Sequence, residues 1–326
     1  MGLTRRSILC GASASLALGP LQRGFAKEDW PARPVRLVCP YAPGGASDIS
    51  LRIFAEQFGQ HLGGKFVVEN KPGAGTRIAN ETVARAEPDG YTLLYAAAPY
   101  ATAEALYGKL SYDPAKDLLP IGMAVLAPLF LIVNAKAPYS TLAEFIAYGK
   151  AKSDGLLLAS PGPGSQPHLA GELLFRDAGV KGLTVQFRGD APSYTELLAG
   201  RVDATLTAIS SALPHIEAGN LRVLGCASSE RSAVYPQAAT LREQGLTSVV
   251  AAGWYGFMAP AATTPSIVSR VASELQRVLA DPQVKEKLLV QGLEPSSKSG
   301  PEFGRFIEDE SRRWTELIRK TGLKGG

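Results

Sequence analysis

The architecture of this chain is visible in one segment, Pro34-Val-Arg-Leu-Val-Cys-Pro-Tyr-Ala-Pro-Gly-Gly-Ala-Ser-Asp48, which leads into the amphipathic run Ile49–Phe58. The apolar residues Val35–Cys39 predict a buried strand. The spacing of apolar residues further on predicts a helix that begins near Ser47 or Asp48. A buried strand, a tight glycine turn and a helix form the basic unit of an α/β fold.

Two glycines, Gly44 and Gly45, stand where this helix begins, and they leave the backbone amides uncovered. Unpaired amides and the positive end of the helix dipole together favour a carboxylate or phosphate at such a point. A plain turn capped by Asp48 explains the same residues. From this segment alone, both interpretations stand.

The N-terminus has the pattern of a secretory signal over residues 1–26. Arg5 and Arg6 precede the apolar stretch Ile8–Leu18, and Gly24-Phe-Ala26 offers a cleavage site between small residues. The stretch is too short to span a bilayer. Adjacent arginines fit a twin-arginine signal as well as a Sec signal. The mature chain therefore begins near Lys27, and we predict a periplasmic location.

Composition predicts a globular protein with two domains. The chain has 326 residues, and about 300 remain after cleavage, enough for two medium α/β domains. Three arginines of the signal account for most of the formal charge of +4, so the mature chain carries +1. No basic run suggests nucleic acid. Cys39 and Cys226 remain after cleavage, and either two buried thiols or a disulfide fits them.

Strand and helix signals alternate along the mature chain, which predicts mostly parallel sheets covered by helices. A second strand, Leu156–Ser160, leads into the glycine-rich turn Pro161–His168 and another helix, as at the start of the chain. Leu118–Asn134 and Ser248–Met258 are apolar segments that we interpret as crossings between the domains. Ligands of such sheets lie beyond the carboxyl ends of the strands, where both glycine turns fall.

Several motifs occur together in the order found in one transport family. They are Arg33–Asp48, Val68–Gly75, Pro88–Tyr91, Leu169–Leu173, Leu197–Val202, Ala212–Ile216 and Trp254–Gly256. Over essentially its whole mature length, the chain resembles the Bug-type (TctC-like) substrate-binding proteins of tripartite tricarboxylate transporters. The resemblance implies a type II-like periplasmic binding protein, an α/β fold with two doubly wound domains, a ligand cleft and hinge strands. Domain 1 would comprise residues 27–124 plus 251–326, and domain 2 residues 125–250.

The resemblance also implies a function and its partners. The protein would capture a small carboxylate, close around it and deliver it to the membrane permease subunits of such a transporter, acting as a monomer. The first glycine loop would hold the carboxylate, and the second would approach across the cleft. We expect these ligand-binding residues: Tyr41, Ala42, Gly44, Gly45, Ala46, Ser47, Asp48, Ala98, Tyr100, Ser160, Gly162, Gly164, Ser165, His168, Arg188, Gly189 and Thr207.

Departures from the family pattern bear on the ligand. The second loop usually carries small hydroxyl residues before its histidine, but here it carries Gln166 and three prolines, Pro161, Pro163 and Pro167. Members that accept amino acids often have an Asp-Asn pair where this chain has Thr207-Ala208. These features favour an aromatic or alkyl carboxylate over citrate or an amino acid.

Other function classes find less support in the sequence. The three histidines lie far apart without a short metal-binding spacing, and no G-x-S-x-G nucleophile motif occurs. Gly73-x-Gly75 lacks the third glycine of a dinucleotide site. We therefore expect no enzyme, no cofactor and no metal. A binding protein that presents its ligand to a signalling receptor is an open alternative, and an exported hydrolase is a weaker one.

Overall fold

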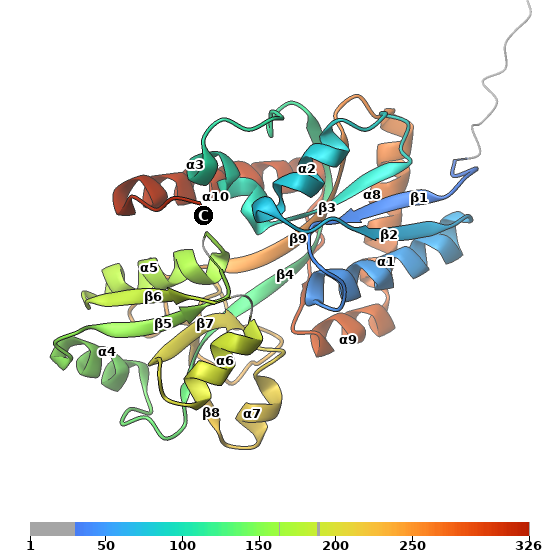
Figure 1. The fold of residues 1–326 in the computed structure, drawn as a ribbon. Coiled ribbons are helices and arrows are strands. Elements are labelled where there is room, and N and C mark those ends of the chain that lie inside the picture. The colour runs from blue at the N-terminus through green and yellow to red at the C-terminus, as the bar shows by residue number, and fades with distance from the viewer. Residues whose placement is uncertain (1–29, 163, 188–189, 326) are drawn as a thin grey trace, which may run out of the picture. The chain divides into compact units, whose positions relative to one another are not determined.

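The strands set the framework of the computed structural model, which describes residues 30–162, 164–187 and 190–325 (Figure 1). Their bounds are β1 Val35–Cys39, β2 Phe66–Asn70, β3 Thr92–Ala97, β4 Leu118–Asn134, β5 Leu156–Ser160, β6 Gly182–Gln186, β7 Ala204–Ala208, β8 Leu221–Cys226, β9 Ala252–Pro260 and β10 Glu294–Pro295. The strand order is β2-β1-β3-β9-β4-β7-β5-β6, and β8 and β10 also pair with β4.

Two similar groups of parallel strands stand at the ends of this order. In the first group β1 lies between β2 and β3, and in the second β5 lies between β6 and β7, all in parallel pairs. The apolar sequence of β1 explains its central place, because a strand covered by helices on both faces is buried on both faces. Each central strand leads into one of the two glycine turns, as the sequence predicts.

Strand β4 links the two groups. Its residues up to Pro128 pair antiparallel with β9, and from Leu129 onward they pair with β7 and β8. Pro120 and Pro128 do not divide this segment, which is a single strand of 17 residues. A register shift beside Pro120 accommodates a residue that cannot donate a ladder hydrogen bond, and a second shift follows Met123.

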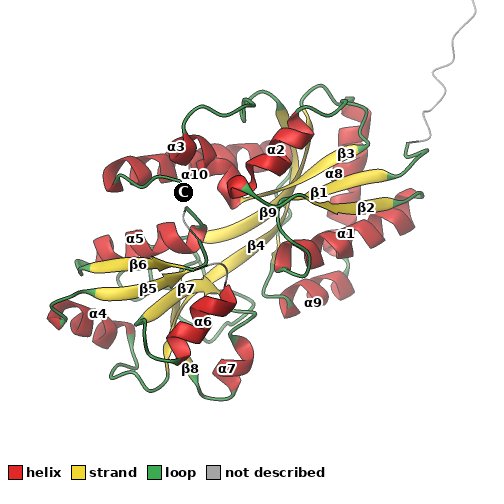
Figure 2. Ribbon diagram, viewed as in Figure 1, coloured by secondary structure: helices red, strands yellow, loops and turns green. Residues whose placement is uncertain are grey.

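Helices cover the strands (Figure 2). The longer ones are α1 Ala46–Leu62, α2 Arg77–Ala84, α4 Leu142–Ala151, α5 Gln166–Ala178, α6 Asp190–Leu198, α8 Pro265–Ala280, α9 Pro282–Val290 and α10 Gly300–Thr321. Short turns of helix are η1 Ala74–Thr76, η2 Ala98–Thr102, α3 Ala103–Tyr107 and α7 Leu213–Glu217. In both groups the right-handed crossovers place successive helices, α1 and α2 or α5 and α6, on opposite faces.

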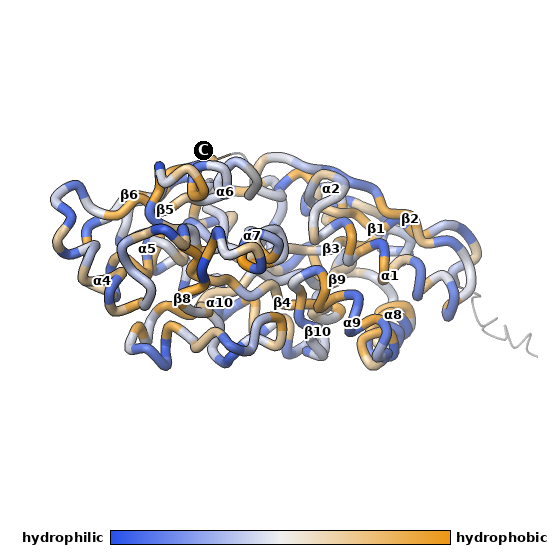
Figure 3. The backbone as a smooth tube through the Cα atoms, turned by 90° about the horizontal axis from the view of Figure 1, so that it is seen from below, coloured by the Kyte–Doolittle hydropathy of each residue, from blue (hydrophilic) through white to orange (hydrophobic). Residues whose placement is uncertain are grey.

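Helix α10 contributes to two hydrophobic clusters. Phe303 and Ile307 pack with Trp254 and residues of β3, whereas Trp314 and Leu317 pack with residues of β4, β5 and α5. Figure 3 shows hydrophobic and hydrophilic residues alternating along outer helices such as α8. Residues 31–326 form one compact unit, so the expected division into two domains stays a prediction.

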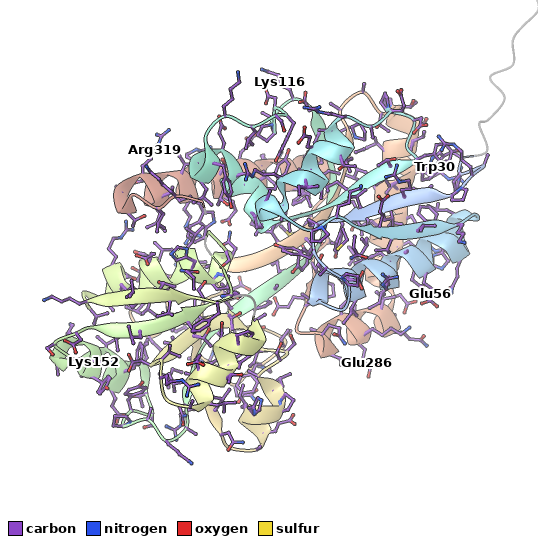
Figure 4. All side chains as sticks on the ribbon, in the orientation of Figure 1. Trp30, Glu56, Lys116, Lys152, Glu286 and Arg319 are labelled. Carbon is purple, nitrogen blue, oxygen red and sulfur yellow. The ribbon has the colours of Figure 1, made fainter. Side chains whose placement is uncertain are left out.

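Several charged side chains lie on the outer side of the helices. Glu56 on α1, Glu286 on α9 and Arg319 on α10 are exposed (Figure 4). Cys39 and Cys226 are buried free thiols, and their burial raises the pKa of both. Among the described residues, none of the helices combines the length and hydrophobicity that a membrane crossing requires.

Candidate ligand-binding site

A cavity of about 840 Å³ opens where the glycine turn after β1 faces the turn after β5. The ends of β3 and β7, the middle of β4, the start of β9 and the turn after α9 complete its wall. Its lining residues are Tyr41–Ser47, Ile49, Ala98, Pro99, Ala127, Leu129, Pro161, Ser165–Pro167, Thr207, Ala208, Ser210, Ser211, Gly253–Tyr255, Val290, Gln291 and Leu293. Among these described residues none carries a charged side chain.

Helix α1 directs its first amides at this cavity. The helix begins at Ala46, slightly earlier than predicted, and Gly45 is its N-cap with φ −84° and ψ 170°. The Ile49 amide donates to the Gly45 carbonyl. Within the described chain the amides of Gly45, Ala46 and Ser47 donate to no other group. These three N–H groups are thus available to an anion.

Asp48 holds the glycine turn in place instead of capping the helix. Its carboxylate accepts hydrogen bonds from the Gly44 amide at 3.0 Å, from Arg52 Nε at 2.9 Å and from Asn70 Nδ2 at 2.9 Å. Burial alone would raise the pKa of Asp48, but these bonds outweigh it and lower the pKa to about 2. Asp48 lies behind the cavity wall, so the structure gives it a supporting position.

Aromatic rings form one side of the cavity. The ring of Tyr41 meets that of Tyr255 edge-on, with centroids 6.4 Å apart, and Tyr255 stacks on Tyr95 at 5.5 Å. Asn70 Nδ2 also donates to the Tyr41 carbonyl at 2.9 Å, which fixes the backbone beside the glycine turn. The half-buried rings of Tyr41 and Tyr255 give the wall flat apolar surface suited to an alkyl chain or an aromatic ring.

The second glycine turn bonds mainly to itself. The Gly164 amide donates to His168 Nδ1 at 2.9 Å, and Ser165 Oγ donates to the Gly162 carbonyl at 2.7 Å. Ser165 Oγ also accepts from the His168 amide and lies 3.2 Å from Ser160 Oγ. Burial lowers the pKa of His168, which favours the neutral imidazole that this geometry requires.

The structure thus separates the predicted ligand-binding residues into three sets. Those in the cavity wall are Tyr41, Ala42, Gly44, Gly45, Ala46, Ser47, Ala98, Ser165 and Thr207. Those outside the wall are Asp48, Tyr100, Ser160, Gly162, Gly164 and His168. Arg188 and Gly189 lie outside the described residues.

The position of the Tyr100 side chain differs most from its predicted place in the ligand site. Its side chain is 3% exposed, and its hydroxyl donates to the Pro114 carbonyl at 2.5 Å. The ring lies beside Tyr112 in the core, 6.4 Å away. The short helix η2 turns this side chain away from the cavity and leaves Ala98 and Pro99 in the wall.

Several wall residues were not predicted as ligand-binding. The sequence marks Gln166 and Pro167 only as differences from the family pattern. It marks Trp254 and Tyr255 only as part of a segment that crosses between the predicted domains. Val290, Gln291 and Leu293 come from the end of α9 and the turn that follows it, more than 240 residues after the first glycine turn. No local pattern identifies this turn, because only the tertiary fold brings it to the cavity.

Relatives with this architecture are known. Protein BugT of Bordetella pertussis is 33% identical over 99% of this chain and 99% of its own. The solved structure of R. palustris Rpa4515 with adipate is 30% identical, covers 91% of this chain and all of its own, and has a TM-score of 0.82. The periplasmic binding protein BugD is 33% identical over 91% of this chain and all of its own, with a TM-score of 0.78.

The family model described as the tripartite tricarboxylate transporter family receptor, TctC, matches residues 50–323. This match covers most of the chain, and the solved neighbours are solute-binding proteins of the periplasm, not enzymes. The predicted α/β periplasmic-binding-protein fold is therefore confirmed, and the chain belongs to the TctC family of tripartite tricarboxylate transporter receptors.

Proposed function

We propose that this protein binds a small carboxylate in the cavity between its two glycine turns and delivers it to the permease of a tripartite tricarboxylate transporter. The observation that carries the proposal is the start of α1. There the amides of Gly45, Ala46 and Ser47 have no hydrogen-bond partner among the described residues, and they lie in the wall of a large cavity. Such amides at the positive end of a helix dipole stabilise a carboxylate without any cationic side chain.

The rest of the cavity wall indicates which chemical groups the ligand carries besides its carboxylate. Tyr41 and Tyr255 on one side and Ala127 and Leu129 on another present mostly apolar surface. Rpa4515, a relative of similar fold, holds adipate. These features support an alkyl or aromatic carboxylate as the ligand class of this chain.

The path of the chain supports closure of two domains around the ligand. Residues 27–124 plus 251–326 form one domain of the proposal and residues 125–250 the other, with β4 as the connecting strand. A ligand that contacts both glycine turns stabilises the closed arrangement selectively, which is the differential affinity that a population shift requires. The permease would then recognise the closed form.

Delivery to a permease requires export. The arginines and apolar stretch of residues 1–26 fit a cleavable signal, although this segment lies outside the described residues. We propose that cleavage releases a periplasmic protein that begins near Lys27. Mass spectrometry of the periplasmic protein should find this N-terminus.

A thermal-shift screen of the chain from Lys27 onward tests the ligand class. The panel contains alkyl monocarboxylates, aliphatic dicarboxylates, citrate, aromatic carboxylates and amino acids, each beside its methyl ester. We expect a saturable rise in melting temperature with an alkyl or aromatic acid and none with its ester, because the ester lacks the anion. A protein that no carboxylate stabilises would contradict the proposed function.

A further inference from the structure

The two helix starts that face the cavity are unequal as anion sites. At α1 three amides are unpaired among the described residues. At α5 the amides of Gly164, Ser165 and His168 already donate to the turn itself, and Pro167 has no N–H. The carboxylate of the ligand therefore belongs at α1, and the opposite end of the cavity needs a different group.

Gln166, the first residue of α5, stands at that opposite end. It lies in the cavity wall and is only 4% exposed. Its Oε1 atom is buried and has no hydrogen-bond partner within the described chain. An unpaired buried acceptor destabilises a folded protein. Because Gln166 lies at the wall of the cavity, a turn of its side chain would bring this amide to a bound molecule, which would complete its hydrogen bonding.

The chemistry of a glutamine amide limits what that molecule presents. The amide is neutral, and a 180° turn of its terminal group exchanges donor and acceptor. No described wall residue is charged, so a second carboxylate or an ammonium group would lose hydration beside these residues without an opposite charge among them. A hydroxyl or carboxamide matches the glutamine amide without that cost.

We propose that Gln166 is the residue that determines specificity, and that the ligand is an apolar monocarboxylate with a neutral hydroxyl or amide group at its far end. The carboxylate binds at the start of α1, the alkyl or aromatic body lies along Tyr41 and Tyr255, and the far group exchanges hydrogen bonds with Gln166. This inference rests on the proposed carboxylate-binding function and adds the class of substrate.

Calorimetric titration with matched acids tests the proposal. The probes are benzoate, para-hydroxybenzoate, para-carbamoylbenzoate, terephthalate and para-(aminomethyl)benzoate, together with hexanoate and its ω-hydroxy derivative. We expect the hydroxyl or amide acids to bind the wild-type protein about tenfold more tightly than the plain acid of the same series. Terephthalate and the ammonium acid should bind more weakly than benzoate.

Two variants separate specificity from structure. Gln166→Leu should abolish the tenfold preference and raise the melting temperature of the free protein by about 2 °C, since an unpaired buried acceptor is removed. Gln283→Leu alters an exposed glutamine of α9 that lies outside the cavity wall, and it should keep the preference. A purely structural role for Gln166 predicts the opposite, a lowered melting temperature.

The outcomes distinguish this inference from the function on which it rests. An unchanged preference in Gln166→Leu, or tightest binding of terephthalate, overturns the inference and leaves carboxylate binding standing. If the wild-type protein binds none of the acids, both the carboxylate function and the inference are wrong.

Discussion

Gly45 is the residue on which the carboxylate site depends most directly. A Cβ atom added to Gly45 would meet no other atom within 4 Å, and its extended backbone suits any residue. Its neighbour Gly44 differs, because its φ of +89° disfavours L side chains. A substitution at Gly45 therefore tests the amides of α1 without forcing the fold to change.

We predict that Gly45→Val weakens carboxylate binding about a hundredfold or more, since the branched side chain covers amides that would make charge-assisted hydrogen bonds. The unfolding free energy should fall by no more than about 1 kcal/mol, the usual scale of an N-cap change. Titration calorimetry and urea denaturation measure the two effects.

Gly162→Val provides the matched control. A Cβ at Gly162 also meets nothing within 4 Å, but this glycine lies outside the cavity wall. Its variant should bind with wild-type affinity. Normal binding by Gly45→Val would show that the carboxylate site lies elsewhere.

For single residues, the sequence predicts where the glycine turns lie but not the direction in which side chains point. Glycine turns follow strands by local rules, so Gly44 and Gly45 are predictable. Tyr100 and Ala98 are two residues apart, yet only Ala98 reaches the cavity, because η2 rotates successive side chains apart. That rotation depends on tertiary contacts of Tyr100 with Pro114 and Tyr112.

Among the elements, the turn between β5 and α5 depends on one titratable group. His168 Nδ1 accepts from the Gly164 amide, so it must be unprotonated, and burial favours that state. The Glu172 carboxylate lies 3.9 Å from Nε2, and its negative charge opposes burial by raising the pKa of His168. The pKa of His168 is lowered on folding, so its stabilising contribution is complete above the ordinary histidine pKa and is lost as the pH falls through the lowered value.

We therefore predict that the wild-type protein loses more unfolding free energy between pH 7 and pH 5 than His168→Gln. The glutamine keeps a side-chain acceptor but does not titrate. Urea denaturation at both pH values measures the difference. If both proteins lost the same unfolding free energy between the two pH values, His168 would not support the turn through its neutral form.

Most elements follow from the sequence because buried strands and amphipathic helices have different periods. The segment Leu118–Asn134 is the exception, since its prolines suggest breaks that the structure does not contain. Pairing on both sides of β4 supplies the hydrogen bonds that hold the strand together through three register shifts. Such compensation comes from neighbouring strands that are distant in sequence.

For the whole molecule, the repeated strand order β2-β1-β3 and β6-β5-β7 places two glycine turns at one cavity. The alternation of elements and the repeated turn predict this arrangement. The contribution of the turn after α9 to the wall is not predictable, because it depends on how the C-terminal helices return to the first strands.

We predict that a bound carboxylate draws the two proposed domains together. Small-angle X-ray scattering should then report a smaller radius of gyration with saturating ligand, because contacts to both turns favour the closed arrangement. The Gly45→Val protein at the same ligand concentration should show no decrease. An identical radius for the free and bound wild-type protein would rule out closure.

Helix α10 has a consequence for how the protein opens. Its first half completes the cluster around Trp254, and its second half completes the cluster around α5 and β5. Detachment of this one helix would uncover both clusters at once. The backbone amides of α10 should therefore exchange with solvent deuterium together with those of the two clusters, and not ahead of them as in a frayed terminal helix.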